Sequence, residues 1–268
     1  MNIVNRLTLR HLRLNKKRTL VTIIGVIISA AMICAVSTFA VSFLDLFQRQ
    51  AIAQTGDWQV RYNRVSAEKV SVIERDRNTK SMTLWRDVGY SLLPESQNEG
   101  KPYLFLEETT QEGFETFPFD LIEGRFPQSP AEVVVSAHLS SNGGIPVKVG
   151  DTLTLAFGIR TADLGDGMQS LTQEYSYMDA ETFTPNGQTR TVTVTGIIER
   201  PTMEPYQAPG YMVFSLLDRD SLAPSDLVDV TTSLKDVSRE LYERSPQTVS
   251  YTHLVRRHHV AGEAPQSV

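Results

Sequence analysis

The chain has 268 residues, with 26 Lys and Arg against 31 Asp and Glu, and a formal net charge of −5. The first 18 residues carry six bases and no acid, so the acidic excess falls on the remainder of the chain. That excess argues against nucleic acid as the partner of the remainder, and against a domain that lies flat on anionic lipid.

Residues 1–18 are expected to form a basic cytoplasmic segment. Lys and Arg close to an apolar span are retained on the cytoplasmic side of a membrane. Apolar residues interleave with these bases, which favours an amphipathic helix on the membrane surface, with a solvated basic tail as the alternative. The bases taken to orient the chain are Arg13, Lys16, Lys17 and Arg18.

Residues 19–44 are 26 residues without a charged side chain and are predicted to be a transmembrane helix. At about 1.5 Å per residue such a helix is about 39 Å long, more than the hydrocarbon core of a bilayer. A cleaved signal peptide is the alternative, but its apolar region spans only about 7 to 15 residues. We therefore interpret the segment as an uncleaved anchor, with the N-terminus inside and residue 45 onward outside.

Residues 45–248 are predicted to form an extracytoplasmic α+β domain with a mixed, mainly antiparallel sheet. The only cysteine, Cys34, lies in the apolar segment, so a packed core rather than disulfides must hold this domain. Residues 162–187 are polar and are expected to be an irregular, exposed excursion. The helix should continue over 45–54 and end at Gly56 and Asp57, with strands at 58–63, 82–93, 103–107, 132–136, 147–157, 189–199 and 211–214 and helices at 67–77 and 236–243.

No motif in the chain indicates catalysis. A phosphate-binding loop, a nucleophile elbow and a zinc-protease helix are all missing from the sequence. The acidic loop at Asp163, Asp166 and Glu174 lacks the glycine and ligand positions of a calcium loop, and His138 is isolated. We therefore expect no catalytic residue, no cofactor and no metal, and interpret the chain as a non-enzyme.

Four sequence blocks, in order along the chain, carry a family resemblance. The block NKKRTLVTIIGVIISAAM resembles the first transmembrane segment of FtsX-like (MacB-type) ABC transporter permeases. The blocks EGRFPQSPAEVVVSAHL, VKVGDTLTLAF and VTVTGIIE are similar to turns and strands of that family's outer domain. The matching turn residues are Gly124, Arg125, Pro127, Gly150, Asp151 and Gly196, with Glu132 and Ser136 beside them.

These turn residues are expected to specify the fold rather than chemistry. Gly124, Gly150 and Gly196 should give the backbone freedom where strands turn. Asp151 should lie at the tip of a hairpin, where its side chain can accept hydrogen bonds from nearby backbone amides.

The resemblance implies a MacB periplasmic-core-like domain on a bacterial plasma-membrane permease. It implies as partners a cytoplasmic ABC ATPase, a second permease copy and membrane lipid, but no nucleic acid. In this interpretation ATP-driven motion of the ATPase is transmitted to the outer domain for export, release or signalling. The alternatives are a single-pass, membrane-anchored extracellular binding or scaffold protein and, with less support, a membrane-anchored enzyme.

The chain reaches Val268 without a second apolar span, which the family would have. We therefore interpret it as the N-terminal part of a permease. Its ending, with VSYTHL similar to translated sequencing-adapter sequence, is interpreted as a disordered or artefactual tail over residues 249–268.

Overall fold

The computed structural model describes residues 15–235 and 256–257. The expected helix at 236–243, the base Arg13 and most of the 249–268 tail lie outside these residues. The chain divides into two compact units, and the boundary between them in the sequence falls between Gln50 and Ala51. The expected boundary between the membrane helix and the outer domain, at residues 44 and 45, stays a prediction.

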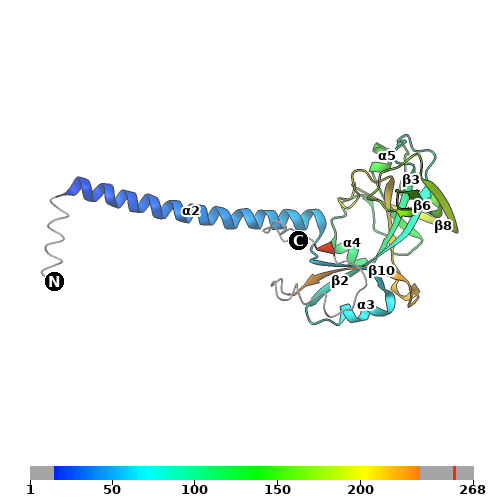
Figure 1. Ribbon diagram of the computed structural model, residues 1–268, viewed down its shortest axis with the longest axis horizontal. Coiled ribbons are helices and arrows are strands. Elements are labelled where there is room, and N and C mark those ends of the chain that lie inside the picture. Colours follow the sequence, from blue (N-terminus) through cyan, green and yellow to red (C-terminus); the bar gives the residue numbers. More distant parts are fainter. Residues whose placement is uncertain (1–14, 236–255, 258–268) are drawn as a thin grey trace. The chain divides into compact units, whose positions relative to one another are not determined.

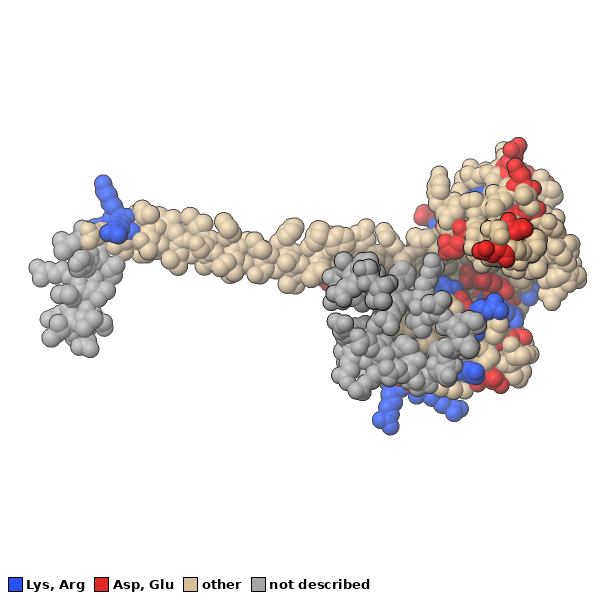
Figure 2. Space-filling model, in the orientation of Figure 1, with Lys and Arg blue, Asp and Glu red and all other residues tan. Residues whose placement is uncertain are grey.

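The N-terminal helix, α2 (Lys16–Thr55), is 40 residues long with a mean hydropathy of 2.6 over its apolar window. It is the one helix in the described residues that is long and apolar enough to cross a membrane. Figure 2 shows a helix surface without charge over most of its length and basic at its first turn. The expected continuation over 45–54 is confirmed, and Gly56, with a φ of 89°, follows the last turn.

The second unit contains short helices and one large mixed sheet (Figure 1). The helices are α3 (Ala67–Glu74), α4 (Gln111–Thr116), α5 (His138–Ser141) and the 3-10 turn η1 (Arg219–Ser221). The strands are β1 (Val60–Ser66), β2 (Thr79–Leu92), β3 (Tyr103–Thr109), β4 (Leu121–Gly124), β5 (Glu132–Ser136), β6 (Thr152–Asp163), β7 (Met168–Leu171), β8 (Thr182–Ile198), β9 (Gly210–Leu216), β10 (Leu227–Leu234) and β11 (Arg256–Arg257).

The sheet has the strand order β11-β1-β10-β2-β3-β9-β5-β8-β6-β7, with β4 added beside β8. All of its pairings are antiparallel except β3 with β9 and β5 with β8. β6 also pairs with β2, through Tyr90 with Gly158 and Ser91 with Phe157. This extra pairing closes the strands from β2 to β6 into a ring, and confirms the expected α+β, mainly antiparallel fold.

Three apolar clusters fill the domain. One lies among the ring strands and includes Leu106, Val135 and Tyr211. A second packs α3 against β1, β2 and β10 through residues such as Ile73 and Leu84. The third is rich in aromatic residues and covers a further face of β2, β3 and β9. The long strand β2 contributes residues to the second and third clusters and is itself one of the ring strands.

Several expected elements are confirmed. β5 has the predicted bounds and is buried at four of its five residues, because both its faces are covered. The strands expected at 82–93 and 103–107 are adjacent and antiparallel, as β2 and β3. α3 begins at the predicted Ala67, and the strands expected at 58–63, 189–199 and 211–214 overlap β1, β8 and β9.

Two expectations need correction, and one strand was not expected. Residues 162–187 are not an irregular excursion, since they contain β7 and the first residues of β8, which pair with β6. β6 is not half of a hairpin with the segment before it, because its partners are β7, β8 and β2. β10 was not expected, although LVDVTTSL is rich in β-branched residues.

Candidate functional site

The residues that carry the family resemblance meet around one stretch of β8, from Val194 to Gly196. Arg125 N donates to Thr195 O at 2.8 Å, and Gly150 N donates to Val194 O at 2.8 Å. Val194 N in turn donates to Asp151 O at 2.8 Å. Two segments that are distant from β8 in sequence are therefore hydrogen-bonded to this one strand through their backbones.

We call the place where residues 124–125 and 150–151 contact residues 194–196 of β8 the junction. The glycines at this junction differ in their roles. Gly124 has a φ of 80°, and a Cβ there would overlap the carbonyl oxygen of Thr195. Gly150 has a φ of 98° and open space around it, so conformation alone requires glycine. Gly196 corrects the expectation of a turn: it lies inside β8, and a Cβ there would come within 2.6 Å of Arg125 O.

Two side chains complete these turns. Asp151 Oδ2 accepts a hydrogen bond from Lys148 N at 2.8 Å, in a turn that leads into β6 rather than at a hairpin tip. Arg125 makes a two-pronged contact with Glu132, at 2.9 and 2.6 Å. Hydrogen bonding from Arg125 lowers the pKa of Glu132 to about 2. This junction around β8 builds the fold and contains no free reactive group.

The other predicted residues are separate from the junction. Lys16, Lys17 and Arg18 form the exposed first turn of α2, in the first unit. Pro127 is buried in the loop between β4 and β5.

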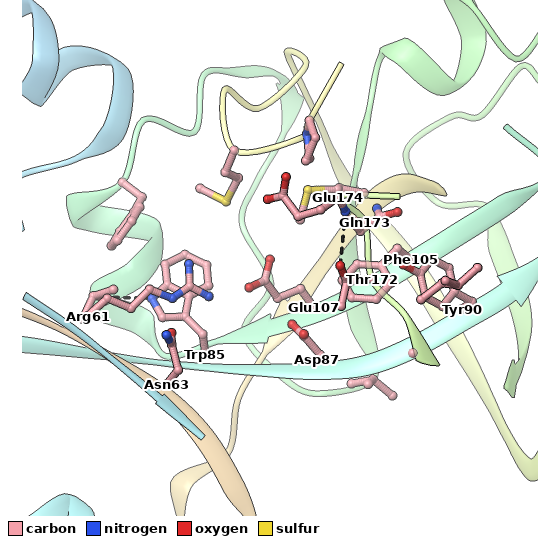
Figure 3. Close-up of a pocket in the computed structure, with 18 of the residues that line it drawn as sticks. Arg61, Asn63, Trp85, Asp87, Tyr90, Phe105, Glu107, Thr172, Gln173 and Glu174 are labelled. Atoms are coloured by element: carbon pink, nitrogen blue, oxygen red, sulfur yellow. Dashed lines mark hydrogen bonds between the residues drawn. The ribbon is translucent and has the colours of Figure 1, made fainter. Parts of the chain in front are cut away.

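A cavity of about 700 Å³ lies elsewhere in the second unit, on the aromatic face of the sheet. Its lining comes from β1, β2, β3, β6, β9 and β10, from the loops after β7 and β8, and from the end of α2. Figure 3 shows the carboxyls of Asp87 and Glu107 at its centre, with Trp85 on one side and Phe105 and Tyr90 on the other.

The sheet itself brings the two carboxyls together. Asp87 on β2 and Glu107 on β3 are direct partners in an antiparallel pair, so their side chains project from the same face. A bulge between Asp87 and Gly89 follows this pair, and Gly89 has a φ of 137°. Because of the bulge, Trp85, Asp87 and Tyr90 can all face the cavity, which strict alternation would not allow.

Both carboxyls have raised pKa values. Burial and the negative charge of Asp87 raise the pKa of Glu107 to about 8, with Arg61 acting in the opposite direction. The surrounding protein groups and the charge of Asp229 raise the pKa of Asp87, although Asp87 is exposed to solvent. Within residues 15–235, no group donates a hydrogen bond to either carboxyl.

The neighbouring residue Glu108, in contrast, has cationic partners for its carboxyl. Its side chain is fully buried on the other face of β3, where Arg86 Nε lies 2.7 Å and Arg190 Nη1 2.5 Å from its carboxyl oxygens. The chain thus supplies two arginines to one buried glutamate and none at hydrogen-bonding distance to the next. Glu107 is only 7% exposed.

Aromatic rings form the walls beside the carboxyls. Trp85 packs edge to face with Phe117 at 4.5 Å between centroids, and Tyr90 lies 4.8 Å from Phe105. The indole N–H of Trp85 is held by Thr231 Oγ1 at 3.0 Å, and that of Trp58 by Thr55 O at 2.8 Å. Both indoles therefore have their polar atoms occupied.

Two further clusters pair a buried glutamate with basic side chains. Glu204 is bound by Lys101 Nζ at 3.0 Å and lies 3.2 Å from Nδ1 of His138. His138 was expected to be isolated, and this contact corrects that expectation. Arg160, completely buried, makes two contacts with Glu181 at 2.8 and 2.6 Å. In the described part of the chain, no group of three or more His, Cys, Asp and Glu side chains could hold a metal ion.

Sequence reasoning missed the carboxyl pair because its members are 20 residues apart and belong to no motif. The available signal was the run YLFLEET, a strand in which two successive glutamates follow four apolar residues. Successive strand residues face opposite sides, so one glutamate on each face of a buried strand predicts two distinct polar sites.

Comparison with protein families gives a match to the MacB-like periplasmic core domain over residues 19–245. Comparison with curated proteins gives no match. Among solved structures, the periplasmic region of MacB from Actinobacillus actinomycetemcomitans aligns at a TM-score of 0.42 and 13% identity, over 72% of this chain and 83% of that one. The extracellular domain of the noncanonic ABC-type transporter YknZ from Gram-positive bacteria aligns at 0.41 and 9% identity, over 70% and 87%.

Proposed function

Because this chain belongs to the family of MacB-like periplasmic core domains of ABC transporter permeases, we propose that it is a permease subunit moved by a separate cytoplasmic ATPase. ATP-driven motion would pass from the membrane helices to the extracytoplasmic domain and serve export, release or signalling. Hydrolysis itself would belong to the partner chain, so this chain is not an enzyme in the proposal.

The observation that supports transmission is the continuity of α2. Its apolar stretch and its last turn form one helix without an interruption, and residues 51–55 of that helix belong to the second unit. Thr202 donates a hydrogen bond to Gln54 O, and Trp58 Nε1 donates to Thr55 O. The end of the helix is therefore bonded into the folded domain, which favours a helix that transmits displacement over a flexible tether.

The basic residues before the span support the proposed topology. Lys16, Lys17 and Arg18 stand at the start of α2, where they favour a cytoplasmic N-terminus in a bacterial plasma membrane. Contacts with anionic lipid headgroups and pairing with a second permease copy complete the proposed assembly.

The test measures whether ATP moves the outer domain in the full-length protein. The chain carries Asp166→Cys in a Cys34→Ser background, labelled with an environment-sensitive fluorophore, and is purified from its native membrane together with its bound partners. We expect an ABC ATPase to accompany the chain, and the fluorescence to change on addition of ATP and vanadate but not of ADP.

A matched pair of helix variants tests the route. Gln48→Gly with Gln50→Gly weakens α2 by about 1 kcal/mol per residue, whereas alanine at both positions retains the helix. The fluorescence change should shrink in the glycine variant and persist in the alanine variant. If no ATPase accompanies the labelled chain with an unaltered helix, or ATP leaves its fluorescence unchanged, the permease proposal is wrong.

The second candidate function is a single-pass, membrane-anchored binding protein. The cavity with its carboxyl pair favours it, because ligand binding there would need no ATPase. Ligand binding without any ATP-dependent change would support this function over the first.

A further inference from the structure

The cavity has a surplus of negative charge once its ion pairs are taken into account. Arg61 lines the cavity, but its Nη2 already lies 2.8 Å from Asp229, outside the lining. Arg160 is likewise paired with Glu181. The carboxyls of Asp87 and Glu107 are then left without a cationic partner at contact distance among the described residues.

A carboxyl in this position is costly to the folded protein. A buried carboxylate is stable only when paired or hydrogen-bonded, and otherwise keeps its proton. The same strand meets this requirement at Glu108, with two arginines. The exception at Glu107, one residue away and facing a cavity, indicates that the missing partner comes from outside the fold.

We propose that the cavity binds an organic cation, with an ammonium or guanidinium group against Glu107 and Asp87 and an apolar body against Trp85, Phe105 and Tyr90. Figure 3 shows these five side chains around one space, with the carboxyls between the aromatic walls. The cation supplies the hydrogen-bond donors that Glu107 lacks.

The walls and the size of the cavity fit that class of ligand. An aromatic face attracts a cation within about 6 Å of its ring centroid, and apolar faces accommodate the remainder of the ligand. A cavity of about 700 Å³ lies within the range of about 300–1,000 Å³ usual for small-molecule sites. It has room for one small organic cation, or for a Lys or Arg side chain with its neighbours in a peptide.

Binding should release a proton. Near neutral pH the Glu107 carboxyl is mostly protonated, since its pKa is about 8. The arriving cation stabilises the carboxylate, so the O–H bond breaks, the proton goes to solvent, and an ion pair forms. The other charges around this carboxyl are Asp87 on β2, Arg61 on β1, Asp229 on β10, Arg160 on β6 and Glu174 after β7.

The two tryptophans of the chain make the test direct. Trp58 and Trp85 are its only tryptophans, and both line the cavity. The full-length protein in detergent is titrated with 2-phenylethylamine while its tryptophan fluorescence is recorded. We expect a saturable change, and an affinity that rises about tenfold between about pH 7 and about pH 9, as the carboxyl loses its proton.

Variants and a neutral ligand separate the charge from the apolar contact. Glu107→Gln should weaken binding at least about tenfold, whereas Glu112→Gln, an exposed residue outside the cavity, should leave it unchanged. The neutral analogue 2-phenylethanol should bind weakly to the wild-type protein. Equal binding of amine and alcohol, or unchanged binding by Glu107→Gln, would overturn the proposal.

A second measurement guards against misfolding of the variant. Glu107→Gln should keep or raise the thermal midpoint of the free protein, because it removes an unpaired buried carboxyl. A lower midpoint would show that Glu107 is a structural residue and would contradict the proposal.

The source of the cation is distinguished by a second pair of ligands. N-acetyl-Phe-Arg-amide is compared with its citrulline counterpart, which has nearly the same shape without the charge. Tighter binding of the arginine peptide than of 2-phenylethylamine indicates a peptide side chain, and the reverse order indicates a free amine. If the arginine and citrulline peptides bind equally, the cation proposal fails for peptides.

This inference deepens the proposed function by naming a ligand class for its outer domain. Since binding is measured on the chain without ATPase or ATP, its failure contradicts the cavity proposal alone. Failure of the ATP-dependent fluorescence change contradicts the permease proposal alone.

Discussion

At the scale of single residues, Gly124 and Gly150 should respond differently to the same substitution. Gly150→Ala places a side chain at a φ of 98° in open space, so we expect a loss of about 1–2 kcal/mol in the free energy of unfolding. Gly124→Ala adds to similar strain an overlap with the backbone of Thr195, which cannot move without disturbing β8. Gly124→Ala should therefore lower the free energy of unfolding clearly more than Gly150→Ala does.

Chemical denaturation of the two variants beside the wild type measures the difference. Equal losses would show that the close approach between Gly124 and β8 has no energetic weight. The comparison also separates conformational strain from steric overlap, since both variants add the same methyl group.

The sequence was informative about this junction because its chemistry is local. A Gly-Asp pair predicts a turn whatever surrounds it, and Asp151 indeed accepts a hydrogen bond from Lys148 N. The roles of Gly196 and Glu107 could not be predicted from local sequence in this way. Their roles depend on Arg125 O and on Asp87, which reach them only through strand pairing.

At the scale of elements, Arg160 ties the segment after β7 to the sheet. Besides its contacts with Glu181, it donates to Thr172 O and Ser176 O, each at 3.2 Å, and lies over the ring of Tyr90 at 5.0 Å. A polar segment without apolar periodicity is thereby ordered by one guanidinium. This explains why the composition of residues 162–187 suggested an irregular excursion.

Arg160→Met should destabilise the protein by about 3–5 kcal/mol, because it leaves the buried carboxyl of Glu181 without its cation. Limited proteolysis should show earlier cleavage between residues 163 and 182 in the variant than elsewhere in the domain. Arg160→Lys retains the positive charge but not the several N–H donors of the guanidinium, so its loss of stability should lie between those of the wild type and Arg160→Met. Cleavage at wild-type rates in Arg160→Met would contradict the assignment.

At the scale of the whole molecule, the cavity carboxyl should set the pH dependence of stability. Burial raises the pKa of Glu107 from 4.5 to about 8, so between these values the folded protein holds a proton that the unfolded chain has released. The free energy of unfolding therefore falls as pH rises through this window. Asp87, whose pKa is also raised, acts in the same direction.

Thermal midpoints of the full chain between about pH 5 and about pH 9 measure this dependence. We expect a decline in the wild type, a shallower decline in Glu107→Gln, and a partial recovery in saturating 2-phenylethylamine. Glu132 acts in the opposite direction, because its lowered pKa gives stability that is lost only as pH falls below its ordinary value of 4.5. A flat profile in the wild type would contradict the burial of an unpaired carboxyl.

The fold class and the anchor were accessible from sequence, since length, charge and periodicity are properties of the chain itself. The ring was not. It depends on two residue pairs between β2 and β6 and on parallel neighbours such as β5 and β8, whose contacts join segments distant in sequence. Local patterns predict strands but not the order in which strands pair.

The strand β2 has a consequence for how the domain folds. It pairs with β10 along its first half and with β3 and β6 along its second, so the layer containing α3 and the ring share one continuous backbone. Neither part can keep its sheet complete when the other is lost. The two should therefore melt in a single cooperative transition, and a cavity-creating substitution at Leu84, in the α3 layer, should lower the stability of the ring as well.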